Sequence, residues 1–334
     1  MDKVIHENEL RELVNKKLQE VGLNAKDSEI VADVLIHADM RGVRSHGTMR
    51  LEHYCARIKA GGINLDSKYN FEKTASAAGV LDADGGMGHV AANIATDIGI
   101  KQVKETGIFA IAIKNSSHGG ALSYFCQKAM EAGMIAIAMV NTDKCVTPFG
   151  SAEGYIGTNP IAFCFPGKKN SILVDMATSE GAFGKIFVAK EKGTSIPKSW
   201  AVDAEGVPTE DPNKAVNLLP FGAHKGTGIA LAIEALTGVG FGAFGPYVVP
   251  MYGDFMDKHR NCSGFYIFID PNIFGGGDSY YTNIDKMIDE IHALKPAVGI
   301  DKVLIPGEIE SNNEAKAKKD GFPVYENVYK FLTS

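Results

Sequence analysis

The first sixty residues carry apolar side chains at the spacing of amphipathic helices. Five apolar residues share one face of a first predicted helix: Leu10, Leu13, Val14, Leu18 and Val21. Gly22 follows where a C-cap glycine is common. A second helix is predicted to begin after Asn24, a favourable N-cap, and to run to Ala38. A third is expected from about Ser45 to Lys59, so that these helices form one N-terminal unit.

Beyond a polar stretch at residues 66–74, short apolar runs alternate with helical ones, which is typical of a sheet combined with helices. Strands are expected at Gly79–Ala83, Ile108–Ile113, Met134–Val140, Ile161–Phe165, Ile172–Val174 and Gly264–Ile269. Further helices are expected at Val90–Glu105, Ala121–Ala132, Asn283–Leu294 and Val324–Leu332. The charged segment Lys190–Ala215, which holds the single tryptophan Trp200, is interpreted as a surface excursion. The pattern indicates an α/β or α+β fold.

The composition excludes several classes of protein. The 334 residues include 34 Lys and Arg against 40 Asp and Glu, a net charge of −6, so there is no basic footprint for nucleic acid or an anionic membrane. The first residues lack the apolar core of a signal peptide, and the longest apolar stretch, residues 229–250, is interrupted by Glu234 and Pro246. We expect a soluble, cytoplasmic protein with a small-molecule substrate.

The cysteine and histidine patterns argue against a metal site. The five cysteines contain no C-x-x-C pair, which fits a reducing compartment. The nine histidines include no H-E-x-x-H motif and no cluster with cysteine, so no metal ligand set is predicted. We therefore expect the cysteines to behave as small apolar residues.

Two glycine patterns resemble the loop that cradles the phosphates of a dinucleotide, and neither fits its context. G-x-G-x-x-G occurs at Gly240, Gly242 and Gly245, but a helical run precedes it where the fingerprint requires a strand. Gly86 and Gly88 lie better, between a predicted strand and a predicted helix. The next predicted strand, however, ends without the acidic residue that binds a ribose. A standard Rossmann site is therefore disfavoured.

The segment RSHGTMRLEHY, residues 44–54, carries a stripe of polar side chains. On a helix, His46, Arg50 and Tyr54 would fall four residues apart on one face. Arg offers a bidentate fork for a carboxylate, and His and Tyr add hydrogen-bond donors. The stripe therefore indicates a site for a carboxylate, with a solvated helix face as an equally simple alternative.

A second constellation lies at the ends of two predicted strands. NSSHGG, residues 115–120, follows one strand, and Asn141-Thr142-Asp143 follows the next, so His118 and Asp143 are expected to converge at one edge of the sheet. An Asp beside a His suits a general base that works near neutral pH. Helix capping by His118 and turn formation by Asp143 are the structural alternatives. A serine hydrolase is disfavoured, because no G-x-S-x-G elbow occurs.

As a whole, the chain resembles the malate/L-lactate dehydrogenase family, a group of NAD(P)-dependent oxidoreductases without a Rossmann fold. The resemblance is carried, in order, by ADMRGVRSHGTMRLEHY, NSSHGGALSYF, VTPFGSAEGYIGTNPIAF, VDMATSEGAFGK, WAVDAEGVPTEDP and PFGAHKGTGIAL. It implies an α/β (α+β) fold in which residues 1–75, completed by residues 283–334, form a helical part that contacts substrate. Residues 76–282 would form a mixed-sheet domain that binds nicotinamide. The resemblance also implies a homodimer.

The resemblance assigns residues to the site as well. It implies that the substrate is contacted by Ser45, His46, Arg50, Tyr54, His118, Thr142 and Arg260. It implies that the cofactor is contacted by Thr158, Asn159, Asp175, Met176, Ala177, Lys185, Lys225, Gly307, Glu308 and Ile309. No metal is implied. NAD is the expected cofactor and NADP stays open, because no residue that would read the ribose can be identified.

Two roles follow from the chemistry of 2-hydroxy acid oxidation. A base must take the hydroxyl proton, and an anchor must hold the carboxylate while a hydride leaves. We predict His118 as the base and Arg50 as the anchor. Asp143 is predicted to be the partner of His118 or of the distal group of the substrate.

The identity of the substrate is predicted from Asp143. Its carboxylate would repel the second carboxylate of malate, by about 1 kcal/mol or more, and would accept the N–H groups of a ureido group. We therefore expect ureidoglycolate, oxidised to oxalurate, as in the ureidoglycolate-oxidising members of the family that the chain most resembles. Malate or lactate is the alternative, because Lys144 or Arg260 could neutralise Asp143. A protein that binds a small acid without turnover is the alternative of a different class.

Overall fold

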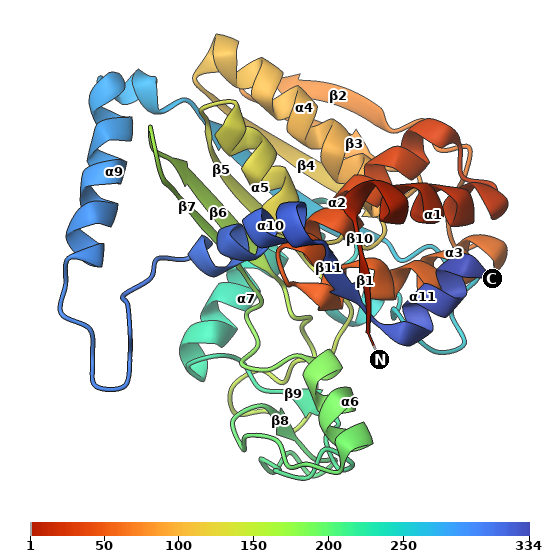
Figure 1. Cartoon of the computed structure of the whole chain (residues 1–334). Coiled ribbons are helices and arrows are strands. Elements are labelled where there is room, and N and C mark those ends of the chain that lie inside the picture. The colour runs from red at the N-terminus through yellow and green to blue at the C-terminus, as the bar shows by residue number, and fades with distance from the viewer. Residues whose placement is uncertain (1) are drawn as a thin grey trace.

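Three helices bear out the helical periodicity of the first sixty residues. In the computed structural model, which describes residues 2–334, they are α1 (Glu7–Glu20), α2 (Ala25–Met40) and α3 (Leu51–Lys59) (Figure 1). The side chain of Asn24 caps α2 by accepting a hydrogen bond from the backbone N–H of Asp27 at 2.9 Å. Gly22, just after α1, has a positive φ of 99°. The apolar pattern and these caps together specify the helices locally.

The third helix begins later than predicted, because a buried carboxylate interrupts it. Two short 3-10 turns precede α3, which starts only at Leu51. Asp39 in α2 accepts hydrogen bonds from the backbone N–H of Thr48 at 2.9 Å and from its hydroxyl at 2.6 Å. The carboxylate of Asp39 also fills the space that a Cβ on Gly47 would need. The continuous helix expected from residue 45 is therefore wrong.

Seven strands form a mixed sheet in the spatial order β2 (Asn70–Ala75), β3 (Ala78–Asp82), β4 (Ile108–Ser116), β10 (Cys262–Ile269), β5 (Ile135–Val140), β6 (Ile161–Pro166) and β7 (Ser171–Met176). Among the described strands of this sheet, only β3 and β4 are parallel, and α4 (Gly88–Thr106) makes the crossover between them. The six strands expected from apolar runs are confirmed. β2, which forms from the polar stretch, was not predicted.

Three strand termini meet at one edge of this sheet, because β10 inserts antiparallel between β4 and β5. Ser116, the last residue of β4, pairs with Cys262 at the start of β10, and Val140, the last residue of β5, pairs with Gly264. The residues that follow β4 and β5 and those that precede β10 are therefore neighbours. This edge carries the candidate site.

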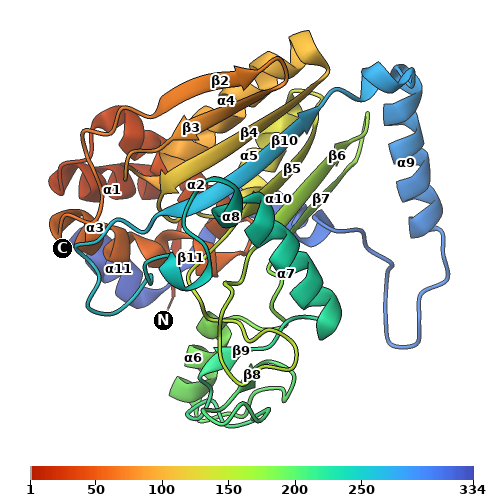
Figure 2. The ribbon, with the colours of Figure 1, turned by 180° about the vertical axis from the view of Figure 1, so that it is seen from behind.

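Helices cover both faces of the sheet. α4 and α5 (Leu122–Glu131) pack on one face, and α7 (His224–Leu236) and α8 (Gly238–Phe241) lie across the other (Figure 2). The core between the sheet and α4 and α5 includes Phe109, Ile111, Phe125, Tyr266 and Phe268, each no more than 2% exposed. Among residues 2–334, no helix combines the length and apolarity needed to cross a membrane.

The first and last segments of the chain share a second core. β1 (Lys3–Ile5) pairs with β11 (Phe322–Val324), and α10 (Glu308–Asp320) and α11 (Glu326–Thr333) pack beside α1 and α2 (Figure 1). Apolar side chains of α1, α2, α3, β11 and α11 form one buried cluster. α10 was not predicted, and the helix expected from Val324 begins only at Glu326, because Val324 ends β11.

The remaining elements lie outside these two cores. The expected surface excursion is an outlying unit, with α6 (Phe183–Lys192), β8 (Ala201–Val202) and β9 (Asn217–Leu218) around Trp200 (Figure 1). α9 (Asp278–His292) stands apart beside β7 and is followed by an extended segment. Short 3-10 turns occur at Arg44–His46, Thr48–Arg50, Gly245–Tyr247 and Pro271–Phe274.

The core shared by the first and last segments predicts a contrast between two valines of the β1–β11 pair. Val324 is 3% exposed and Val4 is 67% exposed. Val324→Ala is expected to lower the free energy of unfolding by about 1–3 kcal/mol, because it removes two buried methyl groups. Val4→Ala is the matched control and should change it by less than about 0.5 kcal/mol. Urea denaturation measures both, and equal effects would contradict the shared core.

Candidate active site

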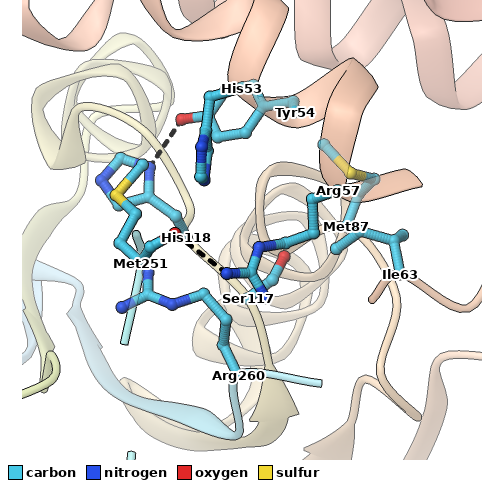
Figure 3. Close-up of a pocket in the computed structure, with 9 residues that line it drawn as sticks. All are labelled: His53, Tyr54, Arg57, Ile63, Met87, Ser117, His118, Met251 and Arg260. Atoms are coloured by element: carbon cyan, nitrogen blue, oxygen red, sulfur yellow. Dashed lines mark hydrogen bonds between the residues drawn. The ribbon is translucent and has the colours of Figure 1, made fainter. Parts of the chain in front are cut away.

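The candidate site lies where the edge of the sheet meets the helical unit (Figure 3). His118 follows β4, Arg260 precedes β10, and Tyr54 projects from α3 toward His118. Together with Arg57 and Met251, these side chains line a buried cavity of about 10 Å³. A cavity of that size holds about one water molecule. The predicted base is therefore closely surrounded by the predicted binding residues.

Two hydrogen-bond donors meet at one ring nitrogen of His118. Its Nδ1 lies 2.7 Å from the Tyr54 hydroxyl and 3.2 Å from the backbone nitrogen of Gly120. Because a backbone N–H can only donate, Nδ1 is the acceptor, and the neutral ring carries its hydrogen on Nε2. The Tyr54 hydroxyl then also donates to Nδ1.

The surroundings of His118 disfavour its charged form. Burial lowers the pKa of His118 well below its ordinary value of 6.5, and the neighbouring His46, Arg50 and Arg260 lower it further. The ring of His46 stacks on that of His118 with 5.7 Å between ring centroids, and burial holds the pKa of His46 at about 4. Both imidazoles are therefore neutral near pH 7, so that His118 is ready to accept a proton.

Asp143 pairs with Arg260, and the expectation that it is the hydrogen-bond partner of His118 is wrong. The Oδ1 atom of Asp143 forms an ion pair with a terminal nitrogen of Arg260, whose Nε donates to the carbonyl of Val249 at 3.1 Å. Both residues lie at the sheet edge, as predicted for Asp143. A guanidinium is a stronger partner for a carboxylate than a neutral imidazole is, which explains why Asp143 pairs with Arg260 and not with His118.

Arg50 has no carboxylate partner among the described residues. Its Nε donates to the carbonyl of Ser45 at 2.7 Å, and one terminal nitrogen contacts the Tyr252 hydroxyl. Burial lowers the pKa of Arg50, which records the cost of keeping this charge away from water. A partly buried guanidinium with only neutral partners is suited to bind an anionic ligand.

Ser45 and His46 support the same region from the turn before Arg50. The hydroxyl of Ser45 lies 3.0 Å from Nδ1 of His46. The stripe of His46, Arg50 and Tyr54 was predicted on one helix, whereas the structure brings these side chains together from two 3-10 turns and α3. Their convergence around His118 is nevertheless as expected.

Arg57 was not predicted as a site residue, and it holds the segment that covers the site. Its guanidinium is 2% exposed and donates to the carbonyls of Pro250, Met251, Phe255 and Lys258 at 2.8–3.1 Å. That segment carries Tyr252, which contacts Arg50, and leads into Arg260. The position of Arg57 three residues after Tyr54 on α3 is the one sequence signal that could have suggested it.

His89 is a second residue that sequence reasoning missed. It lies near the start of α4, is fully buried and meets the ring of Tyr54 edge-on with 5.0 Å between centroids. Burial lowers the pKa of His89 to about 3, so this imidazole is neutral as well. It therefore backs Tyr54 without adding a charge to the site.

Most of the predicted cofactor residues fall into two groups, and the members of each group are neighbours in the structure. Two further residues, Lys185 and Asn159, belong to neither group. In the first group, Thr158 accepts at its carbonyl from the backbone of Thr178, and the carbonyl of Thr178 accepts from Phe221, just before Lys225. Thr142 joins this group, because its hydroxyl accepts from the backbone N–H of Thr158 at 2.9 Å. Thr158, Thr142 and the start of α7 are therefore contiguous.

The second group joins the end of β7 to the start of α10. The backbone N–H of Leu173 donates to the carbonyl of Pro306, which places Gly307 and Ile309 next to the segment of Asp175, Met176 and Ala177. Asp175 accepts from the backbone N–H of Ser123 at 2.8 Å. Glu308 lies here too, but its carboxylate is used within the chain: burial would raise its pKa, yet hydrogen bonds from Lys302 and His292 hold that pKa at about 2.

Lys185 and Asn159 lie differently from the other predicted cofactor residues. The ammonium of Lys185 lies over the ring of Trp200, 5.6 Å from its centroid, in the outlying unit. The side chain of Asn159 is fully buried and hydrogen-bonds to Thr142, Ala230 and Glu234. The buried amide of Asn159 therefore supports the turn that carries Thr158.

Comparisons with known proteins agree with this geometry. The sequence profile of the malate/L-lactate dehydrogenase family matches residues 5–333. The chain is 39% identical to a ureidoglycolate dehydrogenase (NAD(+)) of Escherichia coli K12, covering 97% of this chain and 93% of that protein. It is 40% identical to an L-sulfolactate dehydrogenase of Methanocaldococcus jannaschii, covering 98% and 94%, and 34% identical to a malate dehydrogenase of Pyrococcus horikoshii, covering 98% and 93%.

Solved structures give the same result. The sulfolactate dehydrogenase from Methanocaldococcus jannaschii superposes with a TM-score of 0.92 at 37% identity, covering 99% of this chain and 95% of that one. The malate dehydrogenase from Pyrococcus horikoshii superposes with a TM-score of 0.89 at 31% identity, covering 99% and 94%. A profile that spans nearly all of the chain, together with a shared fold and relatives at this level of identity, establishes its relationship: the chain belongs to the malate/L-lactate dehydrogenase family of oxidoreductases.

Proposed function

We propose that this hydroxyacid dehydrogenase oxidises ureidoglycolate to oxalurate with NAD as the hydride acceptor. The observation that carries the proposal is the charge arrangement of the site. Arg50 is a partly buried guanidinium without a carboxylate partner among the described residues, whereas Asp143 and Arg260 form a pair whose charges cancel. One end of the site thus suits a carboxylate, and the other suits a neutral polar group.

Arg50 is assigned to the carboxylate of the substrate. A carboxylate that replaces the Tyr252 hydroxyl as its partner would gain a charge-assisted hydrogen bond. Such an anchor fixes the adjacent C2 carbon and its hydroxyl relative to His118. The bound carboxylate would also offset the positive charge of Arg50, one of the groups that lower the pKa of His118, and would make the imidazole a stronger base.

The proton path is assigned to Tyr54 and His118. Nδ1 of His118 is the unprotonated nitrogen, and the Tyr54 hydroxyl, 2.7 Å away, donates to it. As the hydroxyl proton of the substrate moves to the Tyr54 oxygen, the Tyr54 proton moves to Nδ1, which leaves a neutral tyrosine and an imidazolium. Burial raises the pKa of Tyr54, which keeps the phenol neutral while it passes the proton on. In the reverse direction His118 returns the proton.

The cofactor is assigned to the seam between the two groups of residues described above. Lys225, at the start of α7, is exposed and supplies a cation for the diphosphate, and Met176, 39% exposed, supplies an apolar surface for a flat ring. The hydroxyls of Thr142 and Thr158, 3.3 Å apart, add polar contacts. These residues fit a nicotinamide dinucleotide, which when bound would accept the hydride from C2 of the substrate.

The distal end of the substrate is assigned to Asp143 and Arg260. A ureido group presents N–H donors and a carbonyl acceptor, and an Asp–Arg pair presents the complementary acceptor and donors. Asp143 is partly exposed, with one oxygen on Arg260 and a second available to a ligand. This complementarity supports ureidoglycolate.

Dicarboxylic or sulfonated hydroxy acids are the second candidate, and one observation favours them. Because Arg260 neutralises Asp143, repulsion of a second anionic group is weaker than the sequence alone predicted. The relatives named as sulfolactate and malate dehydrogenases match the chain about as well as the ureidoglycolate enzyme does. Relative kcat/KM values for ureidoglycolate, malate and sulfolactate decide between the two candidates.

We further propose that the active form is a homodimer. α9 and the segment that follows it stand away from the body of the chain (Figures 1 and 2). They present exposed apolar side chains, including Met287, Leu294, Val298, Ile300 and Leu304, which are 41–105% exposed. Exposed apolar side chains concentrated on one projecting segment are typical of an interface.

His118→Gln tests the proposed function most directly. Loss of the general base is expected to lower kcat by about 100- to 10,000-fold, because the substrate proton then has no acceptor. Tyr54→Phe, which keeps the ring and removes the relay, should lower kcat by about tenfold or more. The affinity for NAD, measured by titration calorimetry, should stay within about threefold of wild type in both variants. Full turnover in His118→Gln would remove it from the mechanism, and absence of turnover in wild type with every acid would favour a binding protein.

The lowered pKa of His118 predicts the pH dependence of oxidation. The base must be neutral, and its pKa in the free enzyme lies well below 6.5, so kcat/KM should stay flat as the pH falls to 6.5 and decline only below it. In kcat, which reports the complex, the decline should begin at higher pH, because the bound carboxylate raises the pKa of His118. Initial rates between pH 4.5 and 8 measure both profiles. A decline in kcat/KM that begins above pH 6.5 would contradict a neutral, partly buried His118.

Asp143→Asn separates the two candidate substrates. Removal of the carboxylate leaves Arg260 without its ion-pair partner, so the ratio of kcat/KM for malate to that for ureidoglycolate should rise about tenfold or more. Asp320→Asn, an exposed aspartate in α10, is the control and should leave the ratio unchanged. A ratio that stays constant in Asp143→Asn would mean that Asp143 does not read the distal group.

A further inference from the structure

The carboxylate of Glu234 is buried behind the site and contacts three separate segments. The residue lies in α7 and is 3% exposed. Its Oε1 accepts hydrogen bonds from Nδ2 of Asn141 at 3.1 Å and from the backbone N–H of Gly245 at 2.7 Å. Its Oε2 accepts from Nδ2 of Asn159 at 2.6 Å. These three N–H groups are the partners of the carboxylate in the described part of the chain, which provides no ion pair for it.

The glycine-rich run at residues 238–245 gains a role from this contact. Its pattern resembles a phosphate-binding loop, but here the backbone N–H of Gly245, at a φ of 45°, binds the carboxylate of Glu234. The carbonyl of Ala243 accepts from Nδ2 of Asn141 at 2.7 Å. A Cβ on Gly238 would lie 2.6 Å from that nitrogen. The run therefore surrounds the side chains of Asn141 and Glu234, and the group that it binds is the carboxylate of Glu234.

Asn141 and Asn159 connect the carboxylate of Glu234 to two parts of the site, the part assigned to the substrate and the part assigned to the cofactor. Oδ1 of Asn141 accepts from the backbone N–H of Ser263 at 2.8 Å, which ties the end of β5 to the start of β10. Oδ1 of Asn159 accepts from the backbone N–H of Thr142 at 3.1 Å. Asp143 follows Thr142 directly, and Thr158 precedes Asn159. The side chain of Glu234 thus connects the strand ends near the Asp143–Arg260 pair with the turn that carries Thr158.

We propose that Glu234 is a positioning residue that keeps the substrate-binding and cofactor-binding halves of the site in register. The inference rests on the proposed function, because that function assigns Asp143 to the substrate and Thr158 to the cofactor. Glu234 itself reaches neither ligand, since its oxygens are used by Asn141, Asn159 and Gly245. The effect passes through the two asparagines.

The polarity of the hydrogen bonds distinguishes positioning from mere packing. Gln has almost the same shape as Glu, but its amide NH2 would face an N–H donor, either that of Asn159 or those of Asn141 and Gly245. Asn159 cannot compensate by turning over, because its Oδ1 already accepts from Thr142. With Asp at position 159, both of its oxygens would accept, one from Thr142 and one from the amide introduced at position 234. The exchange Glu234→Gln with Asn159→Asp therefore restores the hydrogen bond between positions 159 and 234. The hydrogen bond that Nδ2 of Asn159 donates to the carbonyl of Ala230 at 3.1 Å is lost, so the rescue is partial.

The experiment compares Glu234→Gln, Asn159→Asp and the double variant with wild type, and Glu12→Gln, an exposed helical glutamate, is the control. Four quantities are measured: Tm without ligands, the Kd of NAD by titration calorimetry, and KM and kcat for the hydroxy acid. Each single variant is expected to raise both the Kd of NAD and the KM of the acid about tenfold, because both halves shift. The double variant should bind NAD at least about threefold more tightly than Asn159→Asp, although both lack the hydrogen bond to the carbonyl of Ala230. The control should match wild type.

Three results would overturn the proposal. One is a Glu234→Gln variant with the Kd and KM of wild type, even at a lower Tm, because its role would then be structural. Another is a double variant whose defects equal the product of the single defects, because hydrogen-bond polarity would then not matter. The last applies if the single variants do not fold: a double variant that also fails to fold overturns the proposal, and one that folds and binds NAD supports it.

Failure of the proposed function is recognised separately. The Kd of NAD, or of NADP if that cofactor binds more tightly, is measured without any hydroxy acid. A wild-type protein that binds the cofactor but oxidises neither ureidoglycolate nor malate would refute the proposed substrates. The cofactor affinities of the four proteins would still decide whether Glu234 positions the site.

Discussion

The carboxylate of Asp39 directs the chain through the active site. It is 7% exposed and accepts two hydrogen bonds from Thr48, at 2.9 and 2.6 Å. Burial raises the pKa of Asp39 to about 6, against the opposing effect of these hydrogen bonds. Because the carboxylate fills the space beside Gly47, the chain turns there, and α3 starts as a new helix. The direction of α3 brings Tyr54 to His118, so the proposed proton path and the proposed anchor Arg50 depend on this one buried group.

Burial explains which elements could be predicted from the sequence. The inner strands of the sheet carry apolar runs, such as IAIAMV in β5, because both of their faces are covered. β2 is an outermost strand of the sheet, and Phe71 is its one half-buried residue. In α10, Ala317 is the one buried residue. Neither element has a repeating apolar pattern, so periodicity could not reveal it. The prediction that the third helix begins at residue 45 failed for a different reason. A long-range contact from Asp39 overrides the local helical preference of residues 45–50.

Local motifs identified the centres of the site but not the contacts that join them. His118 and Arg50 lie in short segments whose residue types indicate their chemistry. Arg260 and Asp143 are 117 positions apart, and Arg57 donates to a carbonyl 201 positions away. Such pairs depend on the insertion of β10 between β4 and β5, which no local pattern encodes. Asp143 was correctly placed at the sheet edge. Its partner could not be predicted, because the sequence does not show that Arg260, just before β10, lies at the same edge.

The pairing of β1 with β11 makes the order of synthesis relevant to the enzyme. Strands β2, β3 and β4 lie within residues 70–116 and can pair while the rest of the chain is still being made, whereas β5 joins them only through β10. The apolar faces of α1, α2 and α3 find part of their core only in Phe322, Val328 and Leu332. The segment that carries Arg50 and Tyr54 is therefore among the first parts translated and among the last to acquire a stable position. A ribosome-bound chain that ends before residue 322 would hold much of the sheet and lack a finished active site.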